Sequence, residues 1–209
     1  MLAAAGIPFA LERVACTRDE AVVAANELGF PAVLKILTAD IAHKSEAGGV
    51  ALGLRSAADV ASAYDIMMAT VTTREPNARI EGVLVARMIE GIETVIGVKH
   101  DAVFGPVVLF GLGGVYVEVL KDVTLRLAPI DHAAALAMIR AIEGFPLLAG
   151  ARGRPPVDLD ALADALVAMS RFGAAHPEVA SAEINPFIAL PQSGVAVDAL
   201  ILTGGADEA

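Results

Sequence analysis

Apolar residues in the first half of the chain recur with a helical period in some segments and run without interruption in others. Val60, Met67 and Val71 are spaced as one face of a helix that Ser56 caps and that runs to about residue 73. Residues 32–37 form a short apolar run between turn signals, which predicts a strand buried on both faces. The same reasoning predicts a helix over 17–30, capped by Thr17, and strands over 50–54 and 80–88.

The second half of the chain contains more strand patterns than helix patterns. We expect helices over 131–142 and 158–175, and strands over 94–99, 106–110, 115–119, 123–127, 180–184, 187–190 and 195–199. The first half reads β-α-β-β-α-β, and no internal repeat or low-complexity linker interrupts the chain. Together these features predict an α+β fold of two lobes, residues 1–88 and 89–209, which meet near residues 86–91.

Charge and composition exclude several classes of function. The chain has 209 residues and a formal net charge of −10, so nucleic-acid phosphates and anionic membranes would be repelled. Its single cysteine excludes an internal disulfide framework and a cysteine-based zinc site. The most apolar stretch, 102–117, contains Pro106 and four glycines and is too short to span a bilayer. The first residues lack the basic flank of a signal peptide, so we expect a cytoplasmic protein without nucleic-acid or membrane partners.

Lys35 interrupts the apolar run of residues 32–37. A lysine on an edge strand would protect the sheet against aggregation, which is the structural interpretation. Both faces of this run are apolar, however, and this favours a central strand. A buried ammonium group needs an anionic partner, and a phosphate would serve. The pattern therefore favours a binding role for Lys35.

The segment that follows, residues 40–50, combines polar side chains with a glycine pair. Backbone N–H groups at Gly48 and Gly49 can wrap phosphate oxygens, and His43, Lys44 and Ser45 add polar groups to the same loop. The loop is not a Walker A motif, because no G-x-x-x-x-G-K-[ST] pattern occurs in the chain. Taken alone, a single loop histidine more often makes a local hydrogen bond than carries chemistry.

The glycines of residues 111–114 follow a strand but do not form a dinucleotide-binding fingerprint. The third glycine of G-x-G-x-x-G would fall at Tyr116, and no helical pattern follows. Downstream, Glu118, Asp122 and Arg126 recur every four residues in a strand context, which would place them on one face. A solvent-facing row of charges and an active-site role are equally compatible with this spacing.

A candidate metal site lies near the end of the chain. Glu183 and Asn185 are two residues apart on an expected strand and point the same way. Asp198 lies in a short apolar strand that can pair back as a hairpin. Three oxygen-bearing side chains suit Mg²⁺, although two acids that cap strand ends are the plain structural alternative.

Six motifs in this order resemble the ATP-grasp domain of NDP-forming acyl-CoA synthetases, that is, the β subunit of ADP-forming acetyl-CoA synthetase or the equivalent segment of a fused enzyme. The matching stretches are residues 30–35, 40–50, 97–101 with 104–106, 111–114 with Glu118 and Asp122, 145–150, and 183–186. The resemblance covers nearly the whole chain, from about residue 6 to 198. It implies an ATP-grasp fold in which two α+β lobes clamp a nucleotide.

The resemblance also implies roles for residues in both lobes. In that family the lysine that matches Lys35 holds nucleotide phosphates, the loop around Gly48 covers them, and the segment that matches 86–88 lies at the adenine hinge. The expected contacts of ATP or ADP are therefore Lys35, Lys44, Ser45, Gly48, Gly49, Ala86, Arg87, Met88, Glu118 and Arg126.

The resemblance implies two further roles. The family's residues that match Glu183, Asn185 and Asp198 hold Mg²⁺, and position 183 is also commonly Asp in relatives. The histidine that matches His43 receives a phosphoryl group and passes it on, which makes His43 the expected catalytic residue. The family's N-terminal helical lead-in looks trimmed in this sequence.

The complete enzymes of this family interconvert acyl-CoA, ADP and phosphate with free acid, CoA and ATP. No motif here indicates a CoA-binding Rossmann lobe or a companion domain with its own phosphorylated histidine. We therefore expect a nucleotide-binding, phosphoryl-transferring domain or subunit that works in a hetero-oligomer. A CoA-binding α subunit, or fused domains, would supply the sites for the small-molecule acid and its acyl-CoA.

Two alternatives use the same fold. The domain could be a non-catalytic nucleotide-sensing or assembly module associated with a protein acetyltransferase, or it could belong to a carboxylate–amine ligase. A degenerate module should have lost Lys35, His43 or the metal residues, all of which are present. No motif identifies the acceptor site that a carboxylate–amine ligase needs. The ligase-component interpretation is therefore favoured.

Overall fold

The computed structural model describes residues 1–41, 44–114 and 122–204, and the chain divides into two compact units. The smaller unit is Ala10–Ile89, and the larger comprises Met1–Phe9 with Glu90–Ala209. Sequence analysis grouped the first nine residues with the first lobe. They pack instead with the larger unit because Leu2 and Ile7 are buried in its core and the Pro8 carbonyl accepts a hydrogen bond from the Ala196 N–H (2.8 Å).

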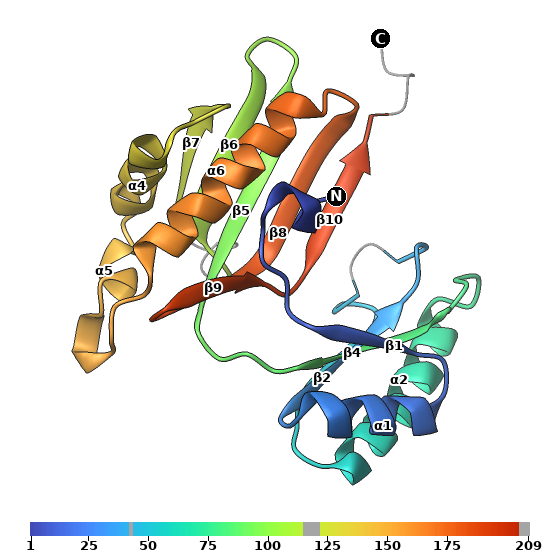
Figure 1. Ribbon diagram of the computed structural model, residues 1–209. Helices are drawn as coiled ribbons and strands as arrows, with labels where there is room; N and C mark the ends of the chain where they lie inside the picture. Colours follow the sequence, from blue (N-terminus) through green and yellow to red (C-terminus); the bar gives the residue numbers. More distant parts are fainter. Residues whose placement is uncertain (42–43, 115–121, 205–209) are drawn as a thin grey trace. The chain divides into compact units, whose positions relative to one another are not determined.

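The smaller unit is a four-stranded antiparallel sheet with the order β1-β4-β2-β3, covered on one face by two helices (Figure 1). Its elements are β1 (Glu12–Ala15), α1 (Arg18–Leu28), β2 (Ala32–Leu37), β3 (Val50–Leu54), α2 (Ala57–Arg74) and β4 (Gly82–Arg87). This is the expected β-α-β-β-α-β order. The core lies between the helices and the sheet residues that alternate toward them, such as Leu34, Ile36 and Val85.

Both expected helix caps of this unit are confirmed. The Thr17 hydroxyl accepts a hydrogen bond from the Glu20 N–H (3.2 Å), and the Ser56 hydroxyl accepts one from the Asp59 N–H (3.1 Å). In each case the side chain satisfies a backbone donor that has no partner inside the helix, which is why the helix begins there.

The larger unit is built on a second antiparallel sheet, with α6 lying across one face of it (Figure 1). Five of its strands follow the order β10-β8-β5-β6-β7, and β9 pairs with β8. The strands are β5 (Ile92–Asp101), β6 (Gly105–Leu112), β7 (Val123–Leu127), β8 (Val179–Leu190), β9 (Ser193–Ala196) and β10 (Ala199–Thr203). The helices are α4 (His132–Ala141), α5 (Phe145–Leu148) and α6 (Leu159–Ala175), with short 3₁₀ turns at Ala3–Ala5 and Ala151–Gly153.

Several expected elements differ from those observed. The two strands expected over 180–190 are one continuous strand, β8, because it pairs with β5 along most of its length and with β10 and β9 on its other edge. The strand expected over 195–199 is interrupted, which places Asp198 between β9 and β10. Strand β1 is the first strand of the expected order, but its bounds were not predicted, since its burial is poor and Val14 is 58% exposed. The expected strand over 115–119 lies outside the described residues.

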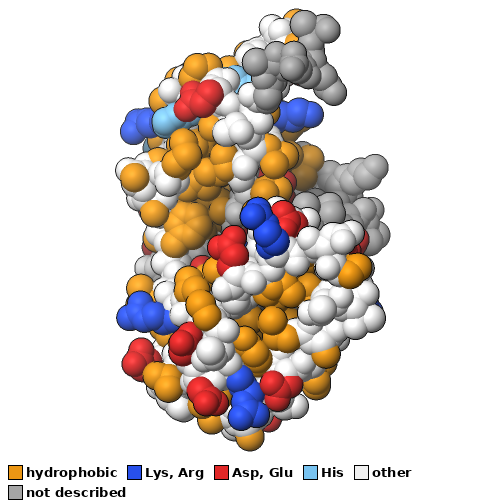
Figure 2. Space-filling view, turned by 90° about the vertical axis from the view of Figure 1, so that its right-hand side faces the viewer, with side chains coloured by type: hydrophobic (Ala, Val, Ile, Leu, Met, Phe, Trp, Pro, Cys, Tyr) orange, Lys and Arg blue, Asp and Glu red, His pale blue; other side chains and the backbone are white. Residues whose placement is uncertain are grey.

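No helix in the described part of the chain is long and apolar enough to cross a membrane. The face of the molecule drawn in Figure 2 carries much hydrophobic surface, with Lys and Arg side chains scattered rather than gathered. The face in view therefore offers no continuous basic surface.

The contact between α6 and β5 gives a testable prediction. A Cβ atom at Gly173 would lie 2.4 Å from Cγ2 of Val98, so Gly173→Ala should destabilise the protein by about 1–3 kcal/mol. In an open helix the same change would stabilise by about 1 kcal/mol. Combining it with Val98→Ala, which removes the clashing methyl groups, should cost less than the sum of the two single changes. Urea unfolding measures all three variants, and a stabilising Gly173→Ala would contradict the packing.

Candidate functional site

Lys35 lies on the face of the smaller unit's sheet that no described helix covers. Lys35 pairs with Leu84 of β4, which in turn pairs with Val14 of β1, so these three side chains share a face. The neighbours of Lys35 along β2, Leu34 and Ile36, point to the other face, into the core beneath the helices. Strand β2 runs between β4 and β3, so the expectation of a central strand is confirmed and the edge-strand interpretation is wrong. The lysine is therefore held in the middle of a sheet face that the helices of this unit do not cover.

The ammonium group of Lys35 contacts a carboxylate that sequence analysis did not single out. Its Nζ is 3.4 Å from Oε1 of Glu12, and the two side chains are 11% and 31% exposed. Glu12 comes from β1, on the far side of β4. The only signal in the sequence was indirect, since a buried ammonium group requires an anionic partner.

The loop between β2 and β3 is anchored by its glycine pair. The Gly48 N–H donates to the Ser45 carbonyl (3.1 Å) and the Gly49 N–H donates to the Lys44 carbonyl (2.7 Å). Gly48 has a φ of 78°, and a Cβ atom at Gly49 would lie 2.5 Å from Cγ2 of Ile36, so both positions favour glycine. In this conformation both N–H groups are used within the loop. His43 lies outside the described residues.

The expected hinge, residues 86–88, ends strand β4. Ala86 pairs with both Glu12 and Val33, so its side chain lies on the same sheet face as Lys35. Arg87 points to the other face, and the Met88 N–H donates to the Pro31 carbonyl (2.8 Å). The side chain of Ala86 thus shares a face with Lys35, and that of Arg87 does not.

The structure brings the three expected metal ligands together in the larger unit. Nδ2 of Asn185 donates to Oε1 of Glu183 (3.0 Å), and the Asn185 N–H donates to the Asp198 carbonyl (3.2 Å). Oδ1 of Asp198 accepts from the Ala199 N–H (2.9 Å), which orients its carboxylate. Glu183 and Asn185 are exposed on one face of β8.

This donor set fits a hard cation. It offers carboxylate and amide oxygens, the ligand types that Mg²⁺ prefers, and Glu183 and Asn185 are exposed. The described residues contain no group of three or more His, Cys, Asp or Glu side chains placed to hold a metal ion. A magnesium site here therefore needs the amide oxygen of Asn185.

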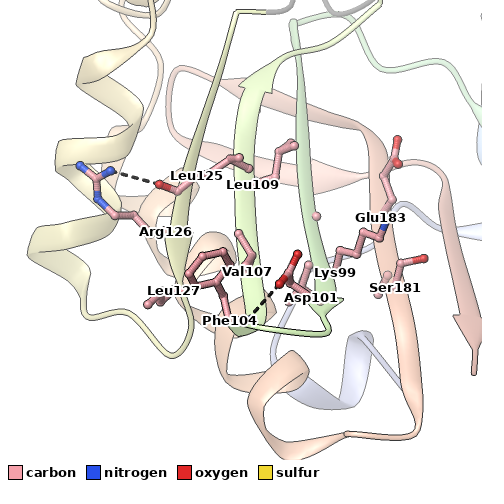
Figure 3. Close-up of a pocket in the computed structure, with 13 residues that line it drawn as sticks. Lys99, Asp101, Phe104, Val107, Leu109, Leu125, Arg126, Leu127, Ser181 and Glu183 are labelled. Carbon is pink, nitrogen blue, oxygen red and sulfur yellow. Dashed lines mark hydrogen bonds between the residues drawn. The ribbon is translucent and has the colours of Figure 1, made fainter. Parts of the chain in front are cut away.

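A cavity of about 670 Å³ lies beside Glu183 on the sheet of the larger unit. Residues of β6 and β7 form its apolar wall, and Lys99, Ser181 and Glu183 form its polar side (Figure 3). At its rim the carboxylate of Asp101 accepts hydrogen bonds from the N–H groups of Phe104 and Val103, both at 2.9 Å. These bonds stabilise the charged form and lower the pKa of Asp101 below its ordinary value.

Arg126 and Asp122 do not join the metal residues. Nη1 of Arg126 donates to the carbonyl of Leu125 (3.1 Å), and Figure 3 shows its guanidinium on the side of β7 away from Glu183. The Asp122 carboxylate accepts hydrogen bonds from the backbone N–H groups of residues 143 and 144 (2.8 and 2.7 Å), which fixes the start of the short helix α5. Glu118 lies outside the described residues.

Comparison with known sequences identifies close relatives of the chain. A family model described as an ATP-grasp domain matches residues 1–202. The β subunit of acetate–CoA ligase (ADP-forming) I from Pyrococcus furiosus is 42% identical over 198 residues, which are 94% of this chain and 85% of the relative. Acetate–CoA ligase (ADP-forming) I from Archaeoglobus fulgidus is 44% identical over 94% of this chain but only 29% of its own length.

Solved structures with the same fold carry nucleotides. The chain is similar to Candidatus Korarchaeum cryptofilum dinucleotide-forming acetyl-coenzyme A synthetase 1 in complex with coenzyme A, Ca-AMPCP and HgCl⁺, with 43% identity, a TM-score of 0.93, and coverage of 97% of this chain and 89% of that chain. A second structure of that enzyme, with coenzyme A and Mg-AMPPCP, has a phosphohistidine segment pointing towards the nucleotide-binding site; identity is 39%, TM-score 0.82 and coverage 97% and 88%.

Proposed function

The chain belongs to the ATP-grasp domain family, and from this premise we propose that it is the nucleotide-binding, phosphoryl-transferring component of an ADP-forming acid–CoA ligase. The complete reaction interconverts acyl-CoA, ADP and phosphate with acid, CoA and ATP. The observation that supports the proposal most is the position of Lys35, a buried ammonium group on the sheet face that the helices do not cover.

Lys35 would bind the phosphates of ATP or ADP. A cation in a region of low dielectric attracts phosphate oxygens more strongly than it would in water, and a rigid strand holds it in place. Phosphoryl transfer depends largely on positioning and charge stabilisation, so this one side chain can contribute to both. Side chains of Lys44 and Ser45 would add contacts from the loop.

The remaining nucleotide contacts stay predictions. The N–H groups of Gly48 and Gly49 reach a phosphate only if the loop gives up its internal hydrogen bonds. At the hinge, Ala86 would contact the nucleotide from the face of Lys35, and Arg87 and Met88 would contribute through their backbone. Contacts from Glu118 and Arg126 are the least supported, since Arg126 points away from Glu183.

Glu183, Asn185 and Asp198 would hold Mg²⁺ through their oxygen atoms. Bound there, the ion would neutralise charge on the nucleotide phosphates. The hydrogen bonds among these residues orient their side chains before any ligand arrives, which lowers the cost of assembling the site.

His43 would act as the phosphoryl carrier. An unprotonated imidazole nitrogen attacks the phosphorus of a partner's phosphohistidine, the partner's P–N bond breaks, and a new P–N bond forms on His43. Attack by a terminal oxygen of the β-phosphate of ADP then breaks that bond and yields ATP. The support for this role is the family resemblance and the position of His43 in the loop that follows β2.

Relatives of this chain occur as β subunits and as segments of longer enzymes. We therefore propose a partner that binds CoA and the acid, either a separate α subunit in a hetero-oligomer or domains fused to this one. Action in the cytoplasm stays a prediction.

Nucleotide binding tests the proposal directly. Lys35→Met keeps the aliphatic stem and removes the charge, so the affinity for Mg²⁺-ADP should fall about 10- to 100-fold while the fold persists. Isothermal titration calorimetry measures the affinity, and melting curves without ligand check the fold. Unchanged affinity in a folded variant would contradict the role of Lys35.

The metal site can be tested separately. Asp198→Asn keeps a hydrogen-bond acceptor for the Ala199 N–H but removes a charged ligand, so about tenfold more Mg²⁺ should be needed for half-maximal ADP binding. Affinity for ADP in EDTA should be unchanged or slightly higher. An Mg²⁺ titration identical to that of the original protein would count against the assignment.

The histidine relay makes the most demanding prediction. With the cognate partner, acyl-CoA and phosphate present, His43→Ala should still let the partner become phosphorylated but should abolish ATP formation. Acid-labile phosphate on each chain and ATP production report the two steps. ATP formation near the original rate would show that His43 is structural.

A further inference from the structure

The contact between Glu12 and Lys35 is loose for an ion pair. Its N–O distance of 3.4 Å exceeds the roughly 2.7–2.9 Å of a charge-assisted hydrogen bond. The two residues belong to strands separated by β4, so both side chains must reach across the sheet to meet. Ala86, which pairs with Glu12 on β4, has a small, buried side chain on this face, at 7% exposure.

The two partners differ in how easily they can leave the contact. The Lys35 side chain is 11% exposed and would lose much of its stabilisation without a nearby negative charge. Glu12, at 31% exposure on an edge strand, can turn into water at little cost. An arriving anion can thus take over Lys35 while Glu12 becomes hydrated.

We propose that Glu12 is a positioning residue that occupies the place of a nucleotide phosphate and is displaced when the nucleotide binds. This inference rests on the proposed role of Lys35 in phosphate binding. In the free protein Glu12 holds the ammonium group over the sheet face. Its carboxylate competes with phosphate for the same cation, so the pair lowers nucleotide affinity while keeping Lys35 in place.

The direction in which one substitution changes nucleotide affinity distinguishes displacement of Glu12 from a purely structural role of Glu12. Glu12→Gln retains an oxygen that can accept a hydrogen bond from Lys35 but removes the competing charge. The affinity for Mg²⁺-ADP should therefore rise about fivefold. A residue that merely supported the fold or the active conformation of Lys35 would lower the affinity when changed.

A double-mutant cycle shows whether the effect passes through Lys35. Calorimetry with Mg²⁺-ADP is performed on the full chain, on Glu12→Gln, on Lys35→Met and on the double variant. The gain from Glu12→Gln should fall below about twofold when Lys35 is already Met. Glu27→Gln removes an equal charge from an exposed site on α1 and serves as the matched control, with no expected change.

Each contrary result has a distinct meaning. Unchanged or weaker binding of Mg²⁺-ADP by Glu12→Gln would overturn the displacement model. An equal gain in affinity when Lys35 is already Met would also overturn it, because repulsion between Glu12 and the phosphates would then explain the gain without Lys35. Normal binding by Lys35→Met would instead refute the proposed function of Lys35. Should Glu12→Gln fail to fold, Glu12→Asp withdraws the carboxylate by one methylene and should also tighten binding.

Discussion

A single buried ammonium group, on the sheet face that the helices do not cover, constrains the smaller unit. Burying a charge is costly unless the surroundings compensate it, so Lys35 requires a carboxylate within reach and a sheet rigid enough to hold both. Strand β1 supplies Glu12, and β4 separates the two with the small residue Ala86. The helices leave this face uncovered because their apolar contacts are all made with the opposite one. The apolar core and the proposed phosphate-binding residue thus lie on different faces of one sheet.

The sheet of the larger unit also has one face packed by a helix and one face that carries polar residues. Helix α6 packs tightly on one side of the sheet, where Gly173 allows contact with Val98. The other side carries Glu183 beside an open cavity. The Asn185 amide and the Ala199 N–H donate hydrogen bonds to the carboxylates of Glu183 and Asp198, which orients the side chains of the proposed metal site. A sheet that is rigid on one face can present polar groups on the other.

Much of this could be predicted from the sequence because the signals are local. The caps at Thr17 and Ser56 and the apolar run around Lys35 each depend on neighbours along the chain. The bounds of strand β1 escaped prediction because an exposed edge strand has little apolar pattern. The partnership of Glu12 with Lys35 depends on strand order, which no local pattern encodes. The side of the sheet on which Arg126 lies was left open by its spacing with Asp122, because it depends on the pairing of Arg126 with the buried residue Val108.

The central claim is that Lys35 binds nucleotide phosphate, and a crystal structure with Mg²⁺-ADP tests it most directly. The account predicts that Nζ of Lys35 lies about 3 Å from a phosphate oxygen and that Glu12 has turned toward solvent. A well-ordered nucleotide whose phosphates lie elsewhere, with Lys35 still against Glu12, would contradict it.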